Sequence, residues 1–258
     1  MIAMPLATVL LLAISLAVGI SIGAVGVGGI LLIPALAALG HLGMHEAMAT
    51  ALFSFFFTGA VGAALFQRRG SIRWRLAAPL CAGSLACGFL GAWANAQLDA
   101  TALTAILAAL IVFAGVYTLR VHRSGSAPPF EDKPRVQMVL LAAIGAFVGF
   151  GSGLTGVGGP AIAVPVMVMA GFPPLATIGA SQAVQVVAAL SGSAAHVAQG
   201  TIDYALAIPV TVAQIAGVPI GVRVVHAVPP EVLRKLIGLV CIATGAWLGV
   251  RLLIHAIA

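Results

Sequence analysis

The chain has 258 residues, of which 62% are hydrophobic and 7% charged, and its formal net charge is +6. A soluble domain carries roughly 25% charged residues, so a soluble protein is excluded, and the basic residues sit in short loops rather than in a patch that would bind nucleic acid. The apolar runs are continuous and do not alternate, which excludes a transmembrane β-barrel. The composition therefore predicts an all-α polytopic membrane protein, because irregular backbone cannot face lipid.

Three largely apolar stretches in each half are long enough to cross a hydrocarbon core of ~30 Å, which takes about 20 helical residues. They are 46–66, 76–94 and 101–120 in the first half, and 177–197, 204–224 and 235–255 in the second. An apolar stretch precedes each set, at 5–39 and at 137–172, and a glycine-rich motif interrupts it. We expect each of these two stretches to form a helical hairpin that turns at its motif, deep in the membrane.

The chain repeats itself with a shift of 130 positions. The shift superposes the two glycine motifs and, far downstream, pairs Pro79 with Pro209 and Gly91 with Gly221. Chance aligns a few glycines in a glycine-rich chain, but not prolines, glycines and segment ends over most of its length. The sequence therefore predicts two repeats, which are joined by a solvated linker. The boundaries are 1–121 for the N-terminal repeat, 122–136 for the linker and 137–258 for the C-terminal repeat.

The basic residues predict that the two repeats have opposite orientations in the membrane. Four arginines within 68–75 flank Gly70, whereas the equivalent loop near Gly200 has none. The reverse holds for loop 95–100, since only its equivalent at 223–235 is basic. Cytoplasmic loops carry an excess of Lys and Arg, so equivalent loops lie on opposite faces and the repeats have inverted topology. The linker is then cytoplasmic and both termini are periplasmic.

The glycine motifs mark the points where helices break. They read Gly23-Ala24-Val25-Gly26-Val27-Gly28-Gly29 and Gly153-Leu154-Thr155-Gly156-Val157-Gly158-Gly159, and Pro160 follows the second. Glycine allows left-handed backbone angles, and proline suits the first turn of a new helix. Each motif is expected to end one half-helix and to begin another, whose free N–H groups and positive dipole end favour an anion. Paired interruptions of this kind point to a transporter site. The alternative is that the glycines only permit close helix packing.

The deep segments contain no Lys, Arg, Asp or Glu, so a bound anion must be held by helix ends, amides and hydroxyls. The candidate substrate-binding residues are Gly26, Gly28, Gly29, Gly156, Gly158, Gly159, Thr50, Ser54, Thr155, Ser181, Gln182 and Gln185. Ser181 and Gln185 are four residues apart and share one helix face. For each hydroxyl the alternative is a bond to its own helix, and for each Gln it is a bond that joins two helices.

Three titratable residues are candidates for coupling transport to protons, namely His196, His45 and Glu46. The alternative for all three is a position at the membrane interface. His41 and His45 are four residues apart, but no third ligand is near. We therefore expect no metal site, and no motif predicts a cofactor.

The duplicated glycine motif, the proline close behind it and the eight predicted segments resemble the TauE/SafE family of membrane proteins, the sulfite exporters. The resemblance covers nearly the whole chain. It is carried by Gly23, Gly26, Gly28, Gly29, Pro34, Gly153, Gly156, Gly158, Gly159, Pro160 and Pro165. It implies transport of a small sulfur-containing anion, such as sulfite or an organosulfonate, across a bacterial inner membrane. Ile30 stands where the second copy has Pro160, which suggests unequal half-helices.

We expect a secondary transporter that works by alternating access, with the anion and the lipid bilayer as partners, no nucleic acid, and a homodimer as one oligomeric state open to it. A transporter of another small anion, a channel and a non-transporting scaffold are the alternatives. An enzyme is not expected, because the sequence has no intramembrane carboxylate pair, no HExxH motif and no Gly-x-Ser-Gly pattern.

Overall fold

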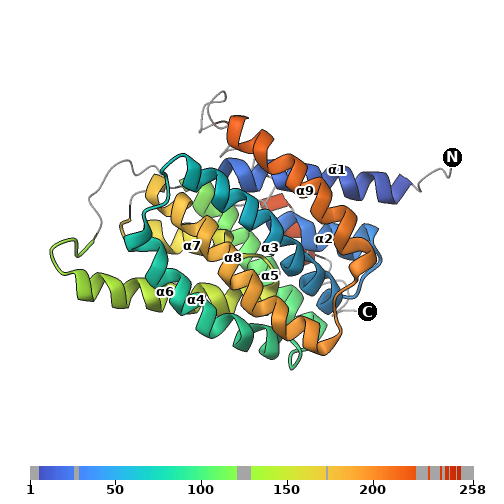
Figure 1. Ribbon diagram of the computed structural model, residues 1–258. Helices are drawn as coiled ribbons and strands as arrows, with labels where there is room; N and C mark the ends of the chain where they lie inside the picture. The colour runs from blue at the N-terminus through green and yellow to red at the C-terminus, as the bar shows by residue number, and fades with distance from the viewer. Residues whose placement is uncertain are drawn as a thin grey trace.

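The computed structural model describes residues 6–25, 29–120, 129–172 and 174–224 and short pieces between 232 and 250, and this part of the chain is helical without any strand. The first helices are α1 (Leu6–Val25), the 3-10 helix η1 (Gly29–Leu31), α2 (Leu32–Leu39), α3 (Met44–Arg68) and α4 (Trp74–Asn95). They are followed by α5 (Ala100–Arg120), α6 (Pro134–Thr155), α7 (Gly159–Met169), α8 (Pro174–Gln199) and α9 (Tyr204–Val224). These helices form a single bundle (Figure 1), which confirms the predicted all-α class.

The helices follow the apolar runs of the sequence. Five of the expected spans, from 46–66 to 204–224, coincide with α3, α4, α5, α8 and α9, and the expected span 235–255 lies largely outside the described residues. Where the runs end, glycine stops the helix. Gly70 follows α3 and Gly200 follows α8, and both have φ of +66°, the left-handed conformation that ends many helices.

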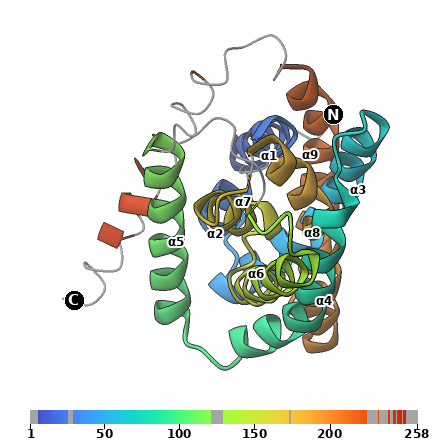
Figure 2. The same ribbon diagram turned by 90° about the vertical axis from the view of Figure 1, so that its left-hand side faces the viewer.

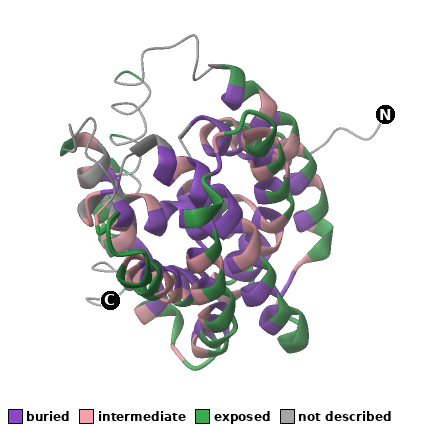
Figure 3. Ribbon diagram, turned by 60° about the vertical axis from the view of Figure 1, so that its left-hand side comes forward, coloured by how far each residue is buried: buried purple, intermediate pink, exposed green. Residues whose placement is uncertain are grey.

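Lipid-facing surfaces are apolar, as a membrane protein requires. Five helices are long and apolar enough to cross a membrane, and they correspond to α1, α3, α4, α6 and α9. Large apolar side chains stand on their outer faces, among them Trp93 at 55%, Val139 at 69% and Val212 at 63% exposure. α8 has 26 residues but is more polar and is not among the five. Most of its residues are buried, because it lies among other helices, and buried residues fill the middle of the bundle (Figure 3).

Glycines bring two pairs of helices into backbone contact. A Cβ on Gly149 of α6 would overlap the carbonyl oxygen of Ser84 in α4, and one on Gly19 of α1 would overlap that of Gln214 in α9. The two contacts are related by the shift of 130 positions. Within each pair the residue numbers rise together along both helices, so α6 runs parallel to α4 and α1 runs parallel to α9. Figure 1 shows the α1–α9 pair and the α4–α6 pair on opposite sides of the bundle.

The central pair, α3 and α8, is antiparallel. Gly62 of α3 faces Gln182 of α8, whereas Leu52, further back in α3, meets Gly192, further on in α8. Residue numbers therefore rise along one helix as they fall along the other. It follows that Gly70, after α3, and Gly200, after α8, lie at opposite ends of this pair.

The two hairpins have arms of unequal length, which corrects the expectation of two half-helices around each motif. α6 has 22 residues, about 33 Å at 1.5 Å per residue, and it follows α4 until Gly153 meets Ala92. α7 has only 11 residues, and its first residue, Gly159, lies against the backbone of Gln185 near the middle of α8. The glycines of α6 did not break the helix, because they serve the contact with α4.

The short arms occupy the interior. α2 and α7 lie within the ring of longer helices when the bundle is viewed from its end (Figure 2), and they take opposite halves of its length in Figure 1. α5 lies at the periphery, and Gly245 of the C-terminal pieces packs against Ile111 and Val112 of α5. The bundle thus holds two half-length helices that start in its interior.

Candidate functional site

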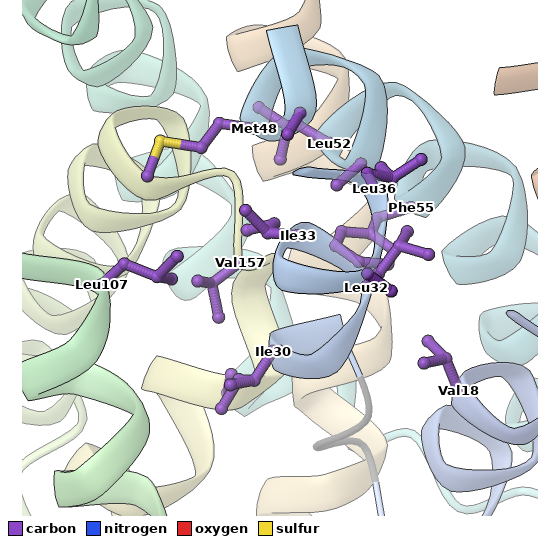
Figure 4. Close-up of a cluster of buried hydrophobic side chains, with 14 of the residues drawn as sticks. Val18, Ile30, Leu32, Ile33, Leu36, Met48, Leu52, Phe55, Leu107 and Val157 are labelled. Carbon is purple, nitrogen blue, oxygen red and sulfur yellow. The ribbon is translucent and has the colours of Figure 1, made fainter. Parts of the chain in front are cut away.

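The two motif regions meet in one buried apolar cluster. Ile30, directly after the first motif, and Val157, within the second, both belong to it. Figure 4 shows them with Ile33 of α2, Phe55 of α3 and Leu107 of α5. Of the predicted glycines of the first motif, Gly29 begins η1, whereas Gly26 and Gly28 lie outside the described residues. The start of η1 and the turn before α7 are therefore neighbours inside the bundle.

The turn of the second motif needs glycine at two positions. Gly156 has φ of +67° and Gly158 has φ of +87°, a region that other residues rarely adopt. The N–H of Gly156 donates to the carbonyl oxygen of Ser152 at 2.8 Å and closes α6. A Cβ on Gly158 would lie 3.2 Å from the ring of Phe55. Close packing, the alternative interpretation of the glycines, thus describes Gly153 and also Gly156, where a Cβ would overlap the carbonyl oxygen of Met48 in α3. Gly156 and Gly158 form the turn.

α7 begins between α3 and α8, and its first turn is buried. A Cβ on Gly159 would lie 3.1 Å from the backbone nitrogen of Gln185. Residues from Gly159 to Ala163 are all buried. The first turn of a helix carries N–H groups without an intrahelical partner and the positive end of the helix dipole. The first turn of α7 therefore brings the positive end of a helix dipole into the interior of the bundle, where the deep segments carry no charged side chain.

Two of the predicted polar residues, Gln182 and Gln185, lie near this turn and bond to other helices. The side-chain Nε2 of Gln185, which is 2% exposed, donates to the carbonyl oxygen of Phe55 at 3.1 Å and to Oγ1 of Thr58 at 3.3 Å. Nε2 of the fully buried Gln182 donates to the carbonyl oxygen of Ile22 in α1 at 3.4 Å. Both glutamines therefore join helices, and Gln185 does so next to the start of α7.

Some of the predicted hydroxyl groups bond within their own helix, and others bond to a distant part of the chain. Oγ1 of Thr155 donates to the carbonyl oxygen of Gly151 at 2.7 Å, and Oγ of Ser181 donates to that of Ile178 at 2.8 Å, so both bond within their own helices. Oγ1 of Thr50 accepts the N–H of Asp203 at 3.1 Å and holds the start of α9. These hydrogen bonds give Thr155, Ser181 and Thr50 a structural role.

Ser54 leads to a residue that the sequence analysis missed. Its Oγ donates to the carbonyl oxygen of Ala51 at 2.7 Å and accepts from Nε2 of Gln214 at 3.3 Å. Gln214 is fully buried in α9. Within the apolar span 204–224 it is the sole side-chain amide, and that isolation in an apolar run was the available signal.

A second missed residue, Asn95, fastens the end of α6. It lies at the end of α4 and is 1% exposed. Its Nδ2 donates to the carbonyl oxygen of Leu154 at 2.7 Å, and its Oδ1 lies 3.0 Å from Nδ1 of His45. The last carbonyl groups of a helix have no intrahelical partner, so Asn95 supplies one.

The three candidates for proton coupling gather around a cavity at this end of the bundle. The cavity has a volume of about 470 Å³ and is lined by Gly43, His45, Glu46, Asn95, Ala96, Gln199 and Thr201. His196 is fully buried behind it, with Nδ1 3.3 Å from Oγ1 of Thr201, and it lies near His45 and the backbone of Gly153. Glu46 is exposed and accepts the N–H of Gly43 at 3.1 Å, which fits the interfacial alternative. Proton coupling stays a prediction.

The opposite end of the bundle is basic. A cavity of about 300 Å³ there is lined by Arg73, Trp74, Arg75, Leu76, Glu131 and Gln137. At the same end, Nη1 of Arg69 donates to the carbonyl oxygen of Val222 at 3.3 Å. The loops before α4 and α6 and the end of α9 therefore meet at one end, which is not the end that holds His45 and Asn95.

A helical bundle with an apolar surface, long membrane-spanning helices and two hairpins that meet in an uncharged interior has the architecture of a membrane transporter. The family model described as sulfite exporter TauE/SafE matches residues 11–248. The chain belongs to the TauE/SafE family, which is a family of multi-pass membrane transporters.

Curated relatives carry the same general description. The "Probable membrane transporter protein YdhB" of Bacillus subtilis (strain 168) is 26% identical over 237 residues, which cover 88% of this chain and 94% of the relative. The "Probable membrane transporter protein MJ0441" of Methanocaldococcus jannaschii is 23% identical over 248 residues, which cover 88% of this chain and 91% of the relative. No solved structure matches the chain.

Proposed function

We propose that the chain is a secondary transporter that moves a small sulfur-containing anion, such as sulfite or a sulfonate, across the bacterial inner membrane by alternating access. The matching family model is described as a sulfite exporter, which supports a sulfur-containing anion as the substrate. The observation that carries the proposal is the position of α7, whose buried first residue lies against Gln185 near the middle of α8.

The start of α7 suits an oxyanion. Backbone N–H groups at a helix N-terminus point at such a ligand, and the dipole favours negative charge. The deep segments have no Lys or Arg, so the anion would be held without a fixed counter-charge and could leave again. Gln185 and Thr58, which bond to each other at 3.3 Å, would shape the pocket from α8 and α3.

The proposal includes two repeats of inverted topology, with the boundaries 1–121 and 137–258. Its support is the pattern of contacts. Gly19 meets Gln214 as Gly149 meets Ser84, and the two members of the central pair, α3 and α8, run in opposite directions. With the basic end of the bundle in the cytoplasm, as positive-inside logic requires, the linker is cytoplasmic and the two termini are periplasmic. A homodimer remains a prediction.

Accessibility labelling tests the inverted topology. Single cysteines introduced at Gly70 and Gly200, in a variant without native cysteines, should react with a membrane-impermeant reagent from opposite sides of oriented membrane vesicles. These loop positions have open surroundings, with no described atom within 4 Å of the place that a Cβ would take, but both residues have positive φ. The neighbouring positions Ser71 and Thr201 serve as second sites. Reaction of both members of either pair from one side would end the inverted arrangement.

Transport assays test the anion site. In proteoliposomes, Gln185→Leu should lower sulfite uptake about tenfold or more, because losing a buried hydrogen-bonding amide costs roughly 1–3 kcal/mol. Gln97→Leu, at an exposed loop position, is the matched control and should leave uptake unchanged. Saturable uptake with counter-exchange is expected of a transporter, and linear flux without exchange would indicate a channel. Normal uptake by a folded Gln185→Leu variant would rule out the proposed pocket.

A further inference from the structure

The parallel helices α4 and α6 begin at different levels, and a cavity lies where they do. Gly153 of α6 lies between Gly88 and Ala92 of α4. The same register, carried back along both helices, places Gln137 level with Trp74, the first residue of α4. α6 has already begun at that level, so its first turn projects beyond the start of α4. The cavity of about 300 Å³ at the basic end of the bundle is lined by residues from both sides of this step.

Hydrogen bonds hold the walls of the cavity in place. Nε2 of Gln137 donates to the carbonyl oxygen of Pro129 at 2.8 Å, which ties the turn that carries Glu131 to α6. On the other side, Nε1 of Trp74 donates to Oε1 of Gln67 at 2.9 Å and fastens the indole ring to the end of α3. The cavity therefore lies between side chains with defined positions.

The cavity carries a net positive charge. Arg73 and Arg75 line it, both are exposed, and no described residue forms an ion pair with either guanidinium. Of the described lining residues, Glu131 alone is acidic. α4 begins here without a side-chain cap and without an acidic residue in its first turn. Its free N–H groups and the positive end of its dipole add to the field of the two arginines, so the cavity suits an anion.

The helices around the cavity also present an apolar surface. Val136, Met138 and Val139, in the first two turns of α6, are large apolar residues that stay exposed. Trp74 is 53% exposed, and tryptophan is enriched where the hydrocarbon core meets the headgroups. A ligand that fills the cavity and covers this surface needs a negative group at one end and hydrocarbon at the other.

We propose that the cavity binds the headgroup phosphate of an anionic phospholipid of the surrounding bilayer, with Arg73 and Arg75 as its charged partners. The acyl chains lie along the exposed apolar residues of α6. Basic pockets between transmembrane helices bind such headgroups, and the guanidinium fork of arginine matches the geometry of a phosphate. The lipid bridges the starts of α4 and α6 and should stabilise their crossing. Because the anion pocket proposed above lies near the middle of α8, this site does not depend on the transported substrate.

Thermal unfolding in mixed micelles tests the site. The purified, delipidated protein in dodecyl maltoside is titrated with dioleoylphosphatidylglycerol, with dioleoylphosphatidylcholine or with inorganic phosphate, at constant ionic strength. Phosphatidylglycerol should raise the unfolding temperature in a saturable manner, since a ligand of the folded state stabilises it. Phosphatidylcholine, whose headgroup has no net charge, and free phosphate, which has no acyl chains, should each raise it less. A higher salt concentration should weaken the effect of phosphatidylglycerol.

Four variants separate the cavity from the general charge of this end of the bundle. Arg73→Gln and Arg75→Gln should each weaken the apparent affinity for phosphatidylglycerol about fivefold, the contribution of one basic residue near an anionic surface. Arg68→Gln is the matched control, because it removes the same charge from an exposed residue of the same basic segment that does not line the cavity. Its affinity should stay nearly unchanged. Glu131→Gln removes the negative charge from the cavity and should tighten binding, a gain that a misfolded variant could not produce.

Three results would overturn the site. An equal loss of affinity in Arg68→Gln and in the two cavity variants would show that the lipid is attracted to the whole basic end. Equal stabilisation by the two lipids, or an unchanged affinity in Glu131→Gln, would show that no headgroup phosphate enters the cavity. Stabilisation by inorganic phosphate as large as that by phosphatidylglycerol would assign the cavity to a soluble anion. Sulfite uptake tests the proposed function separately, so either proposal can fail while the other stands.

Discussion

The crossing of α1 with α9 and the crossing of α4 with α6 share their backbone contacts but differ in their side chains. Gly221 meets Ile20 in the first crossing as Gly91 meets Phe150 in the second. Where the first crossing has Gln214, however, the second has Ser84. The difference teaches that the two crossings share the glycines that set helix spacing, whereas the buried polar residue differs between them.

The same holds for the central helices. Gln182 and Gln185 of α8 correspond, 130 positions earlier, to Leu52 and Phe55 of α3. Phe55 packs on Gly158 of the second motif and belongs to the apolar cluster. One side of the α3–α8 pair is thus lined with amides, and the other is filled with hydrocarbon. The anion site that we propose lies on the side of the pair that carries the amides.

The largest expected effect concerns the shared contacts. Gly91→Ala and Gly221→Ala should each destabilise the folded protein by about 3 kcal/mol or more, because the new Cβ would overlap a backbone oxygen that cannot move independently. The measurement is the free energy of unfolding in a detergent titration. Gly249→Ala, where no described atom lies within 4 Å of the new Cβ, is the control. A large loss in only one of the two variants would show that the crossings are not equivalent.

A smaller effect is expected where the second crossing ends. Asn95→Ala should cost about 1–2 kcal/mol of unfolding free energy, the upper part of the range for hydrogen bonds between membrane helices, because it leaves the carbonyl group of Leu154 and His45 without their partner. Thr155→Val is the matched control one residue away. Thr155 bonds only within α6 and corresponds to Val25, so its loss should stay within about 0.5 kcal/mol. Equal losses would contradict the role given to Asn95.

Much of the fold could be predicted because lipid imposes simple rules. Long apolar runs must be helical, and the start of α9 at Tyr204 was predicted to the residue. The arms of the hairpins could not be predicted, since glycine in a sequence can mean either a break or a close contact. Gly145, Gly149 and Gly153 recur every four residues along α6 and contact α4. Only Gly156 and Gly158, with positive φ, belong to the turn.

The candidate site was predicted in part for a related reason. Buried amides such as Gln182 and Gln185 stand out in an apolar sequence, because their burial is costly without partners. Hydroxyl groups carry no such signal, since a threonine can always bond to its own helix, as Thr155 does. Asn95 lies at the end of a span, where polar residues of the adjoining loop are common, so nothing in the sequence signalled its role. Its role depends on the end of α6, which lies 59 residues away in the chain.

The glycine contacts also determine which parts of the protein could move as rigid bodies. α4, which precedes residues 122–136 in the sequence, packs along its length against α6, which lies mostly after them, and α1 packs in the same way against α9. Neither half of the sequence therefore contains both helices of such a pair. A polypeptide ending in the linker should fold only when the other half is co-expressed, and any rearrangement during transport must shift mixed blocks against each other rather than one sequence half against the other.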